Sequence, residues 1–347
     1  MERSMSNFGL ADFFVAKNRK RASFLDGVLD MLDWVRIEKL LKTGLGRTQN
    51  PCAGAKAYPA LLMFKVLLLQ QWYDLSDQDT EFALLDRISF SRFTGLSLND
   101  SVPDHTTICR FRNLLVEKDL LEILLHEINK QMEQKGKLVK RGVAVDASLV
   151  ASAARPRKLI ETTAVTCDRK EEDLSEESSE QVRVTYSHDT DAAWLKKGNQ
   201  CHYGYKIHTA VDVDTGLILS AHATAANLSD TGELGRLVKE ARLADHARVY
   251  GDKGYTSSAN SSLLKERRCK DGIMKKAYRN KPLSERQRQR NRLISQKRYI
   301  VERVFGTLKK SYNLVRASYI GTLKVQGELL LSALAYNLKR SLFLMPA

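Results

Sequence analysis

The chain has 347 residues, 43% of them hydrophobic and 28% charged, with a formal net charge of +15 and an isoelectric point near 9.5. This composition is typical of a globular protein, and a strongly basic one is expected to bind a polyanion. Its five cysteines include no C-x-x-C pair, which argues against a zinc site or a disulfide scaffold. The apolar runs are too short to cross a bilayer, so we expect no membrane association.

Residues 1–135 are predicted to be mostly helical. Apolar residues recur at helical spacing as far as residue 50, Pro59 opens an apolar helix, and Ser76 has the side chain of an N-cap. A later helix, which follows Pro103, carries Arg110 and Arg112. These arginines are candidate phosphate contacts, although two solvated arginines on a helix would give the same pattern. Packing of the helix-turn-helix kind remains open.

The pattern changes to β-structure after residue 135. Residues 142–146 form an almost continuous apolar run that ends on Asp146, which predicts a central strand with an acid at its end. Such an aspartate is either a turn residue or a site residue. Further on, residues 168–180 hold seven acids with serines between them. We interpret this stretch as the centre of a mobile, acidic insertion around residues 160–195.

Residues 203–224 alternate in polarity around a turn at 214–216 and predict a β-hairpin. Lys206 and His208 lie on one face of the first strand. They are candidate DNA contacts, although exposed sheet residues need no function. A second short strand, residues 247–252, again ends on an acid, Asp252, which is followed by Lys253.

Residues 265–310 hold nearly all of the chain's excess positive charge. Seventeen lysines and arginines stand against four acids, a local net charge of +13. A solvated charged helix would interleave both signs, so we interpret this segment as a phosphate-binding surface. Arg286, Arg288 and Arg290 are candidate phosphate contacts within it.

The stretch from Arg298 to Lys309 is predicted to be a helix. On a helical wheel Arg298, Glu302 and Lys309 fall within about 40° of one another. They border an apolar stripe made of Ile300, Val301, Val304, Phe305 and Leu308. One carboxylate is therefore held beside a packed face with a cation before and after it. A surface helix with a simple i,i+4 ion pair is the alternative.

Two aspartates at strand ends and a helical glutamate suggest one chemistry. Clustered carboxylates with few His or Cys favour Mg²⁺ or Mn²⁺, which prefer oxygen ligands. Two such ions can activate an attacking hydroxyl or water and stabilise the leaving oxygen of a phosphodiester. The spacings between Asp146, Asp252 and Glu302 are not specific in themselves, because a chain with 41 acids offers many such triples.

Several strings resemble the core of bacterial insertion-sequence transposases of the DDE class, with the insertion sequence five family as the nearest match. They are V-A-V-D-A-S, H-Y-G-Y-K-I-H, Y-G-D-K-G-Y and V-E-R-V-F-G-T-L-K-K, with P-D-H-T-T-I-C-R-F-R in the helical part. The related signature is Tyr-x2-Arg-x3-Glu-x6-Lys. Arg298, Glu302 and Lys309 fit it, whereas Ser295 stands where the tyrosine belongs.

The resemblance implies an α/β, ribonuclease H-like catalytic domain at residues 136–347, with a mixed five-stranded sheet flanked by helices. In that fold the first and fourth strands lie side by side and parallel. Asp146 would lie next to Asp252, and Glu302 would come from a following helix. These three acids would hold two Mg²⁺ ions, for which Mn²⁺ can substitute. Residues 1–135 would be a helical domain that binds DNA and dimerises.

The implied function is that of a transposase that binds the terminal inverted repeats of its own element, cleaves the ends and joins them to target DNA. A homodimer bound to DNA and a cytoplasmic, nucleoid-associated location are expected with it. Arg298, Lys309 and Lys253 would contact phosphates. Two other interpretations remain: a DNA-binding protein descended from a transposase but no longer catalytic, and a metal-dependent nuclease that does not join strands.

Overall fold

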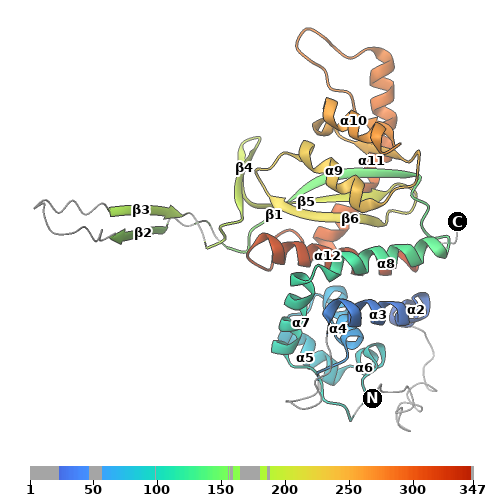
Figure 1. The fold of residues 1–347 in the computed structure, drawn as a ribbon, viewed down its shortest axis with the longest axis vertical. Helices are drawn as coiled ribbons and strands as arrows, with labels where there is room; N and C mark the ends of the chain where they lie inside the picture. Colours follow the sequence, from blue (N-terminus) through green and yellow to red (C-terminus); the bar gives the residue numbers. More distant parts are fainter. Residues whose placement is uncertain are drawn as a thin grey trace, which may run out of the picture.

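A layer of helices and a mixed β-sheet are stacked on one another, with helix α12 (Thr322–Ser341) packed against both (Figure 1). The computed structural model describes residues 23–46, 57–97, 99–154, 156, 159–164, 180–185 and 188–344. In this part of the chain no helix is long and apolar enough to span a membrane.

The helical layer is built from the amino-terminal part of the chain. Its helices are α2 (Phe24–Met31), α3 (Trp34–Leu45), α4 (Ala60–Tyr73), α5 (Asp77–Asp86), α6 (Ile88–Thr94), α7 (His105–Glu117) and α8 (Leu120–Gln134). Ser76 caps α5 by accepting a hydrogen bond from the backbone of Asp79, as its sequence position predicted. Between α7 and α8, Asp119 adopts a left-handed conformation with φ of 51°, so this region is two helices and not one.

The main sheet has six strands in the order β4-β5-β1-β7-β8, and β6 also pairs with β5. The strands are β1 (Gly142–Ala151), β4 (Ala193–Lys197), β5 (Gln200–Asp212), β6 (Ile218–Ala225), β7 (Arg248–Gly251) and β8 (Lys270–Ile273). Strand β5 runs antiparallel to β1, β4 and β6, whereas β7 is parallel to both β1 and β8. The mixed sheet was predicted. The sixth strand, β4, was not.

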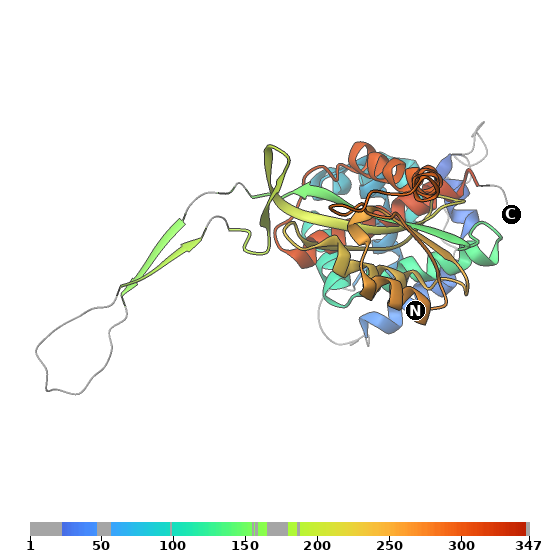
Figure 2. The same cartoon turned by 90° about the horizontal axis from the view of Figure 1, so that it is seen from above.

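The predicted insertion around residues 160–195 needs correction at its end. Strand β4 begins at Ala193, inside that range, and belongs to the main sheet. Strands β2 (Leu159–Ala164) and β3 (Glu180–Thr185) form a separate two-stranded ribbon, which projects away from the rest of the molecule (Figure 2). Residues 165–179, which carry most of the acids of this segment, lie outside the described residues.

Helices cover both faces of the sheet. Helix α9 (Asp230–Ala241) lies against β5, β6 and β1, and α11 (Glu285–Ser311) lies against β1, β5 and β7 on the opposite face. The short helices η2 (Lys253–Tyr255) and α10 (Ser258–Glu266) connect β7 to β8. The edge of β6 is covered by α12, where Gln326 and Asn337 bind backbone groups of the strand. This contact removes an open sheet edge.

One continuous apolar core joins the helical layer to the sheet. Trp72 of α4 donates a hydrogen bond over 2.8 Å to the carbonyl of Ala335 in α12, and Asn129 of α8 binds the carbonyl of Ile218 in β6. The two parts therefore share buried contacts along α12 and α8. A boundary at residues 135–136 between two domains stays a prediction.

Candidate active site

Asp146 and Asp252 are brought together by the parallel pairing of β1 and β7. The ladder runs from Gly142 opposite Arg248 to Ala144 opposite Tyr250. The same register continued by two residues places Asp146 opposite Asp252, directly after β7 ends. Asp146 itself lies inside β1 and not at its end, which corrects the sequence-based expectation. The resemblance also implied that the two aspartates lie next to each other, and their positions in the structure agree with this.

Glu302 reaches the same place from α11. Val301, Val304 and Leu308 are buried, so the predicted apolar stripe is the face that packs on the sheet. Glu302 lies beside that stripe, and 56% of its side chain is exposed. The helix begins at residue 285, well before the predicted start, and Ser284 closes its first turn with a capping box.

The guanidinium of Arg298 contacts all three acids. Its Nη2 donates a hydrogen bond over 2.8 Å to Oδ2 of Asp146. The same nitrogen lies 3.7 Å from Oε1 of Glu302, and Nη1 lies 3.8 Å from Oδ1 of Asp252. Three carboxylates from β1, from the end of β7 and from α11 therefore surround one cation. The principal partner of Arg298 is Asp146 and not its i,i+4 neighbour.

Arg298 and Asp146 are less exposed than the other two acids of the site. The side chain of Asp146 is 21% exposed and that of Arg298 only 12%, against 49% for Asp252. Burial raises the pKa of Asp146 above its ordinary value, and the charge of Arg298 opposes that rise. Burial alone would lower the pKa of Arg298, but Asp146 raises it, so the guanidinium stays charged.

The donor set fits a divalent cation by its chemistry, because carboxylate oxygens are what Mg²⁺ and Mn²⁺ prefer. Among the described residues, however, no group of three or more His, Cys, Asp or Glu side chains is arranged to hold a metal ion. The three acids are instead arranged around Arg298. Asp146, Asp252 and Glu302 could hold a metal once that guanidinium has moved.

Tyr255 is a buried residue beside the site. It is the last residue of the string Y-G-D-K-G-Y, but no role was predicted for it from the sequence. It follows Asp252 in η2 and is 1% exposed. Burial, and then the nearby charge of Asp146, raise its pKa far above the ordinary value. Its hydroxyl has no hydrogen-bond partner within the described part of the chain. Its position three residues after Asp252 is the feature of the sequence that could have indicated that it lies beside the site.

Two predicted phosphate contacts lie around the acids. Lys253 directly follows Asp252 and is exposed. Lys309, two turns beyond Glu302 on α11, is half-buried, and its pKa is lowered by burial and by the charge of Lys197. Lys253 is thus next to Asp252 in the chain, and Lys309 is on the same helix as Glu302.

Comparison with known families places the chain in one of them. The model of the family described as "Transposase DDE domain" matches residues 137–338, which include all three acids and Arg298. The chain belongs to this DDE transposase family. A second model, described as "Transposase domain (DUF772)", matches residues 13–114.

A curated relative supports the assignment. The chain is 39% identical over 235 residues to the "Transposase for insertion sequence element IS1106" of Neisseria meningitidis serogroup B, across 67% of this chain and 76% of that protein. Among solved structures, the piggyBac transposase synaptic complex with hairpin DNA matches 93% of this chain and 80% of its own at 11% identity, with a TM-score of 0.39. The Mos1 transposase paired-end complex gives 9% identity over 95% and 94% of the two chains and a TM-score of 0.21.

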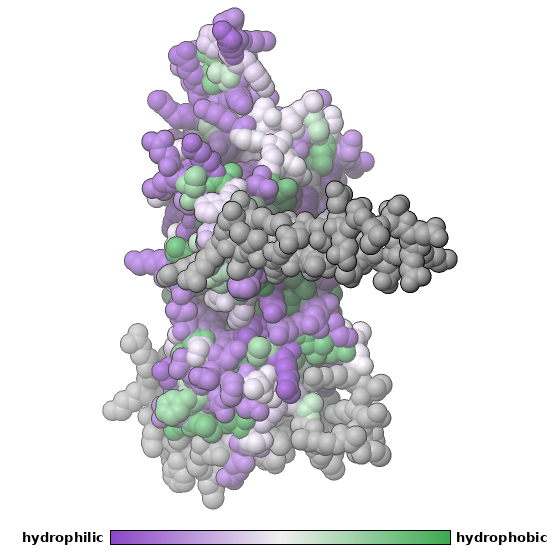
Figure 3. All heavy atoms as spheres, turned by 90° about the vertical axis from the view of Figure 1, so that its left-hand side faces the viewer, coloured by the Kyte–Doolittle hydropathy of each residue, from purple (hydrophilic) through white to green (hydrophobic). Residues whose placement is uncertain are grey.

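The basic segment of this transposase splits into exposed and engaged arginines. Arg286 and Arg288 are exposed on the first turns of α11. Arg290 instead donates hydrogen bonds to the carbonyls of Asp271 and Ile273 and fixes the helix to β8. At the top of the molecule in Figure 3, where α11 begins, hydrophilic residues predominate, with some apolar ones among them. Arg286 and Arg288 fit the predicted phosphate surface better than Arg290 does.

The prediction that His208 contacts DNA is wrong. Its side chain is 0% exposed and is stacked on His222, with ring centroids 4.9 Å apart, on the face of the sheet that α9 covers. Burial and the neighbouring His222 lower its pKa to about 3, so it is neutral. Lys206, on the same face, pairs with Asp230 over 2.9 Å and is 12% exposed. It is held by α9 and does not face solvent.

Arg112 is likewise not a phosphate contact. It binds both carboxylate oxygens of Asp77 over 2.7 Å and the amide oxygen of Gln70, and its guanidinium lies 5.0 Å from the ring of Tyr319. Only 5% of its side chain is exposed. Burial alone would lower its pKa, but the hydrogen bonds to Asp77 raise it. Arg110 on the same helix is exposed and remains a candidate.

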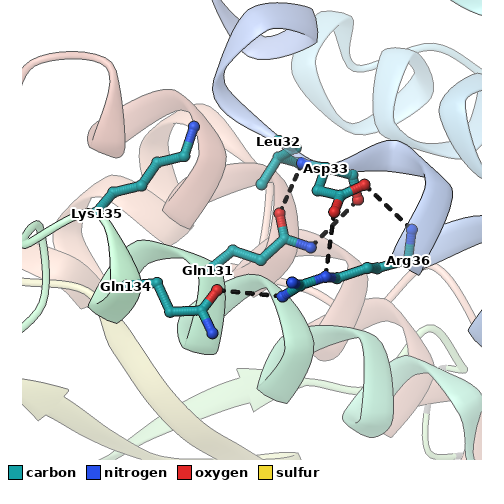
Figure 4. Close-up of a pocket in the computed structure, with 6 residues that line it drawn as sticks. All are labelled: Leu32, Asp33, Arg36, Gln131, Gln134 and Lys135. Atoms are coloured by element: carbon teal, nitrogen blue, oxygen red, sulfur yellow. Dashed lines mark hydrogen bonds and ion pairs between the residues drawn. The ribbon is translucent and has the colours of Figure 1, made fainter.

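A polar hollow of about 260 Å³ lies elsewhere, between α3 and α8 (Figure 4). It is lined by Leu32, Asp33, Arg36, Gln131, Gln134 and Lys135. Gln131 accepts a hydrogen bond from the backbone of Asp33 over 2.8 Å, and Arg36 binds Asp33 and Gln134. These contacts join two helices, so the hollow has a structural explanation and takes no part in the site.

Proposed function

We propose that this transposase binds the terminal inverted repeats of its own insertion sequence, cleaves the ends by metal-dependent phosphodiester hydrolysis and joins the 3′ ends to target DNA. One observation carries the proposal: Asp146, Asp252 and Glu302 come from distant parts of the chain and meet at one guanidinium. Membership of the DDE family supports it independently.

Each residue has a role in this proposal. Asp146, Asp252 and Glu302 would hold two Mg²⁺ ions, for which Mn²⁺ can substitute. When bound, these ions would activate the attacking oxygen and stabilise the leaving oxygen of the phosphodiester. Arg298 and Lys309 neutralise phosphate charge beside the acids, which would otherwise repel the substrate. Asp146, the most buried of the three, fixes the position of the site on the rigid sheet.

The DNA-binding surface would extend from the site along α11. Lys253, Arg286 and Arg288 are exposed cations that add affinity for the backbone irrespective of sequence. The amino-terminal helices, with Arg110 exposed on α7, would recognise the transposon ends and form a homodimer on DNA. The proposed location is the bacterial cytoplasm, at the nucleoid, where such DNA lies.

Two finer assignments belong to the same proposal. Counted without β4 and the ribbon, β1 and β7 are the first and fourth strands of the sheet and lie side by side and parallel. This arrangement supports a ribonuclease H-like fold. Arg298, Glu302 and Lys309 support the insertion sequence five family, with Ser295 as the departure from its signature.

The test is a reaction on the DNA that flanks the gene. In the presence of Mg²⁺, the wild-type protein should cut that DNA at the ends of the element and join the freed 3′ ends to a target duplex. Mapping the cut and joined strands detects both products. Asp252→Asn should still shift the DNA on a gel but give no cut strands. Cleavage without joining would favour a nuclease, and binding without either would favour a protein that has lost its activity.

A further inference from the structure

Arg298 occupies the position that a metal ion would need. It is the one cation in contact with Asp146, Asp252 and Glu302 together among the described residues. Its side chain is 12% exposed, so it is held within the site and does not merely lie across it. As an arginine it cannot lose its charge near neutral pH. Only movement of the side chain can clear the site.

The hydrogen-bonding capacity of the Arg298 guanidinium is only partly used. Only the contact with Asp146 is a hydrogen bond, at 2.8 Å, and the other two contacts are longer ion pairs. Its Nε is buried and has no acceptor in the part of the chain that the structure describes. A buried donor without a partner is costly. A phosphate group can accept two parallel hydrogen bonds from a guanidinium and so offers Arg298 a better-matched partner.

Metal and guanidinium exclude one another at this site. Both would need the same carboxylate oxygens, and two cations a few ångströms apart in a partly buried place repel strongly. A metal would therefore bind only to the fraction of molecules in which Arg298 has moved, and its apparent affinity would fall by that fraction. A DNA phosphate that holds Arg298 elsewhere would remove this cost.

We infer that Arg298 is an internal cation that blocks the acidic site until a DNA phosphate draws it away, so that metal and DNA bind cooperatively. This inference rests on the proposed function. It also explains why an arginine lies so deep among the acids. By thermodynamic reciprocity, metal must raise the affinity for DNA by the same factor by which DNA raises the affinity for metal.

The experiment measures Mn²⁺ binding by calorimetry, with and without a short duplex from the flank of the gene. Arg298→Gln removes the internal cation, and Arg298→Lys keeps a charge but cannot form the planar contacts. Arg303→Gln is the matched control, because Arg303 is an exposed arginine about one and a half turns further along the same helix. Asp252→Asn shows whether the ion binds at this site.

Without DNA, Arg298→Gln should bind Mn²⁺ at least about tenfold more tightly than wild type, with Arg298→Lys between them and Arg303→Gln unchanged. With DNA, wild type should gain affinity and Arg298→Gln should gain little. Equal affinities of wild type and Arg298→Gln in the absence of DNA would overturn the inference alone. No Mn²⁺ binding by either protein, with or without DNA, would overturn the proposed function as well.

Discussion

At the scale of single residues, Arg112 and Arg298 show how partners decide the role of an arginine. Both lie on helices among basic residues, and both were predicted to contact phosphate. Arg112 is fully engaged by Asp77 and Gln70, whereas Arg298 makes one hydrogen bond and two longer ion pairs. Asp77 is 35 residues from Arg112, and Asp146 is 152 residues from Arg298. Local sequence patterns do not identify such partners.

Arg112→Ala should destabilise the protein by about 3 kcal/mol, because it leaves the carboxylate of Asp77 partly buried without its partner. Arg110→Ala, two residues away on the exposed face, should change stability by less than about 0.5 kcal/mol. Urea unfolding of both variants gives the comparison. Similar small losses in the two would mean that the Arg112 contact contributes little, and that its burial has another cause.

His208 marks a different limit of the sequence. The alternating pattern correctly placed Lys206 and His208 on one face of β5. It could not tell which face a helix would cover, because both faces of a central strand carry mixed residues. Helix α9 covers this face, where its Glu233 pairs with His222 over 2.8 Å. Lys206 and His208 were therefore assigned to the correct strand, but they were expected on a face open to DNA and lie on the face that α9 covers.

At the scale of elements, α11 was predicted best where it packs. The apolar stripe from residue 300 to residue 308 identified the face on the sheet. In the first half of the 27-residue helix only Asn291 and Ile294 are buried, so hydrophobic periodicity did not reveal it. That half is held by polar bonds, in which Asn291 binds the backbone of Lys275 and Arg290 binds β8. Hydrogen bonds to distant backbone leave little trace in a hydrophobic pattern.

The exposed first turns of α11 should provide salt-dependent DNA affinity. Replacing Arg286 and Arg288 together with glutamine should flatten the slope of log affinity against log salt by up to about 2, since each lost phosphate contact removes about 0.9. Arg290→Gln is the control on the same helix: it should leave the slope nearly unchanged and lower the unfolding midpoint. An unchanged slope in the double variant would place DNA elsewhere.

Strand β1 explains why the position of Asp146 was misjudged. The apolar run stops at Asp146, so a strand end was predicted there. The strand continues to Ala151 because β5 pairs with it over that whole stretch. The neighbour on the other side, β7, ends at Gly251, and Arg298 of α11 contacts Asp146 just beyond that end. The site thus lies where one of two neighbouring strands ends.

At the scale of the whole molecule, the acids are separated by 106 and 50 residues and meet only after the sheet and α11 have packed. The residue patterns predicted the helical first part, several strands and three candidate acids, and the resemblance to a known family supplied the mixed sheet and the convergence of the acids. It did not predict that α12 packs on both layers, because an apolar helix matches any core. It also did not predict that Arg298 would lie among the acids.

The central claim is that Asp146, Asp252 and Glu302 act as one catalytic site. Single-turnover cleavage of end-containing DNA in Mg²⁺ tests it most directly, with Asp146→Asn, Asp252→Asn and Glu302→Gln compared with Glu285→Gln, an exposed glutamate at the start of the same helix. Loss of groups that merely support a metal ligand costs about 10–100-fold, so each of the three variants should lose at least about 100-fold while keeping DNA binding. Glu285→Gln should cleave at the wild-type rate. Near wild-type cleavage by any one of the three variants would contradict the account.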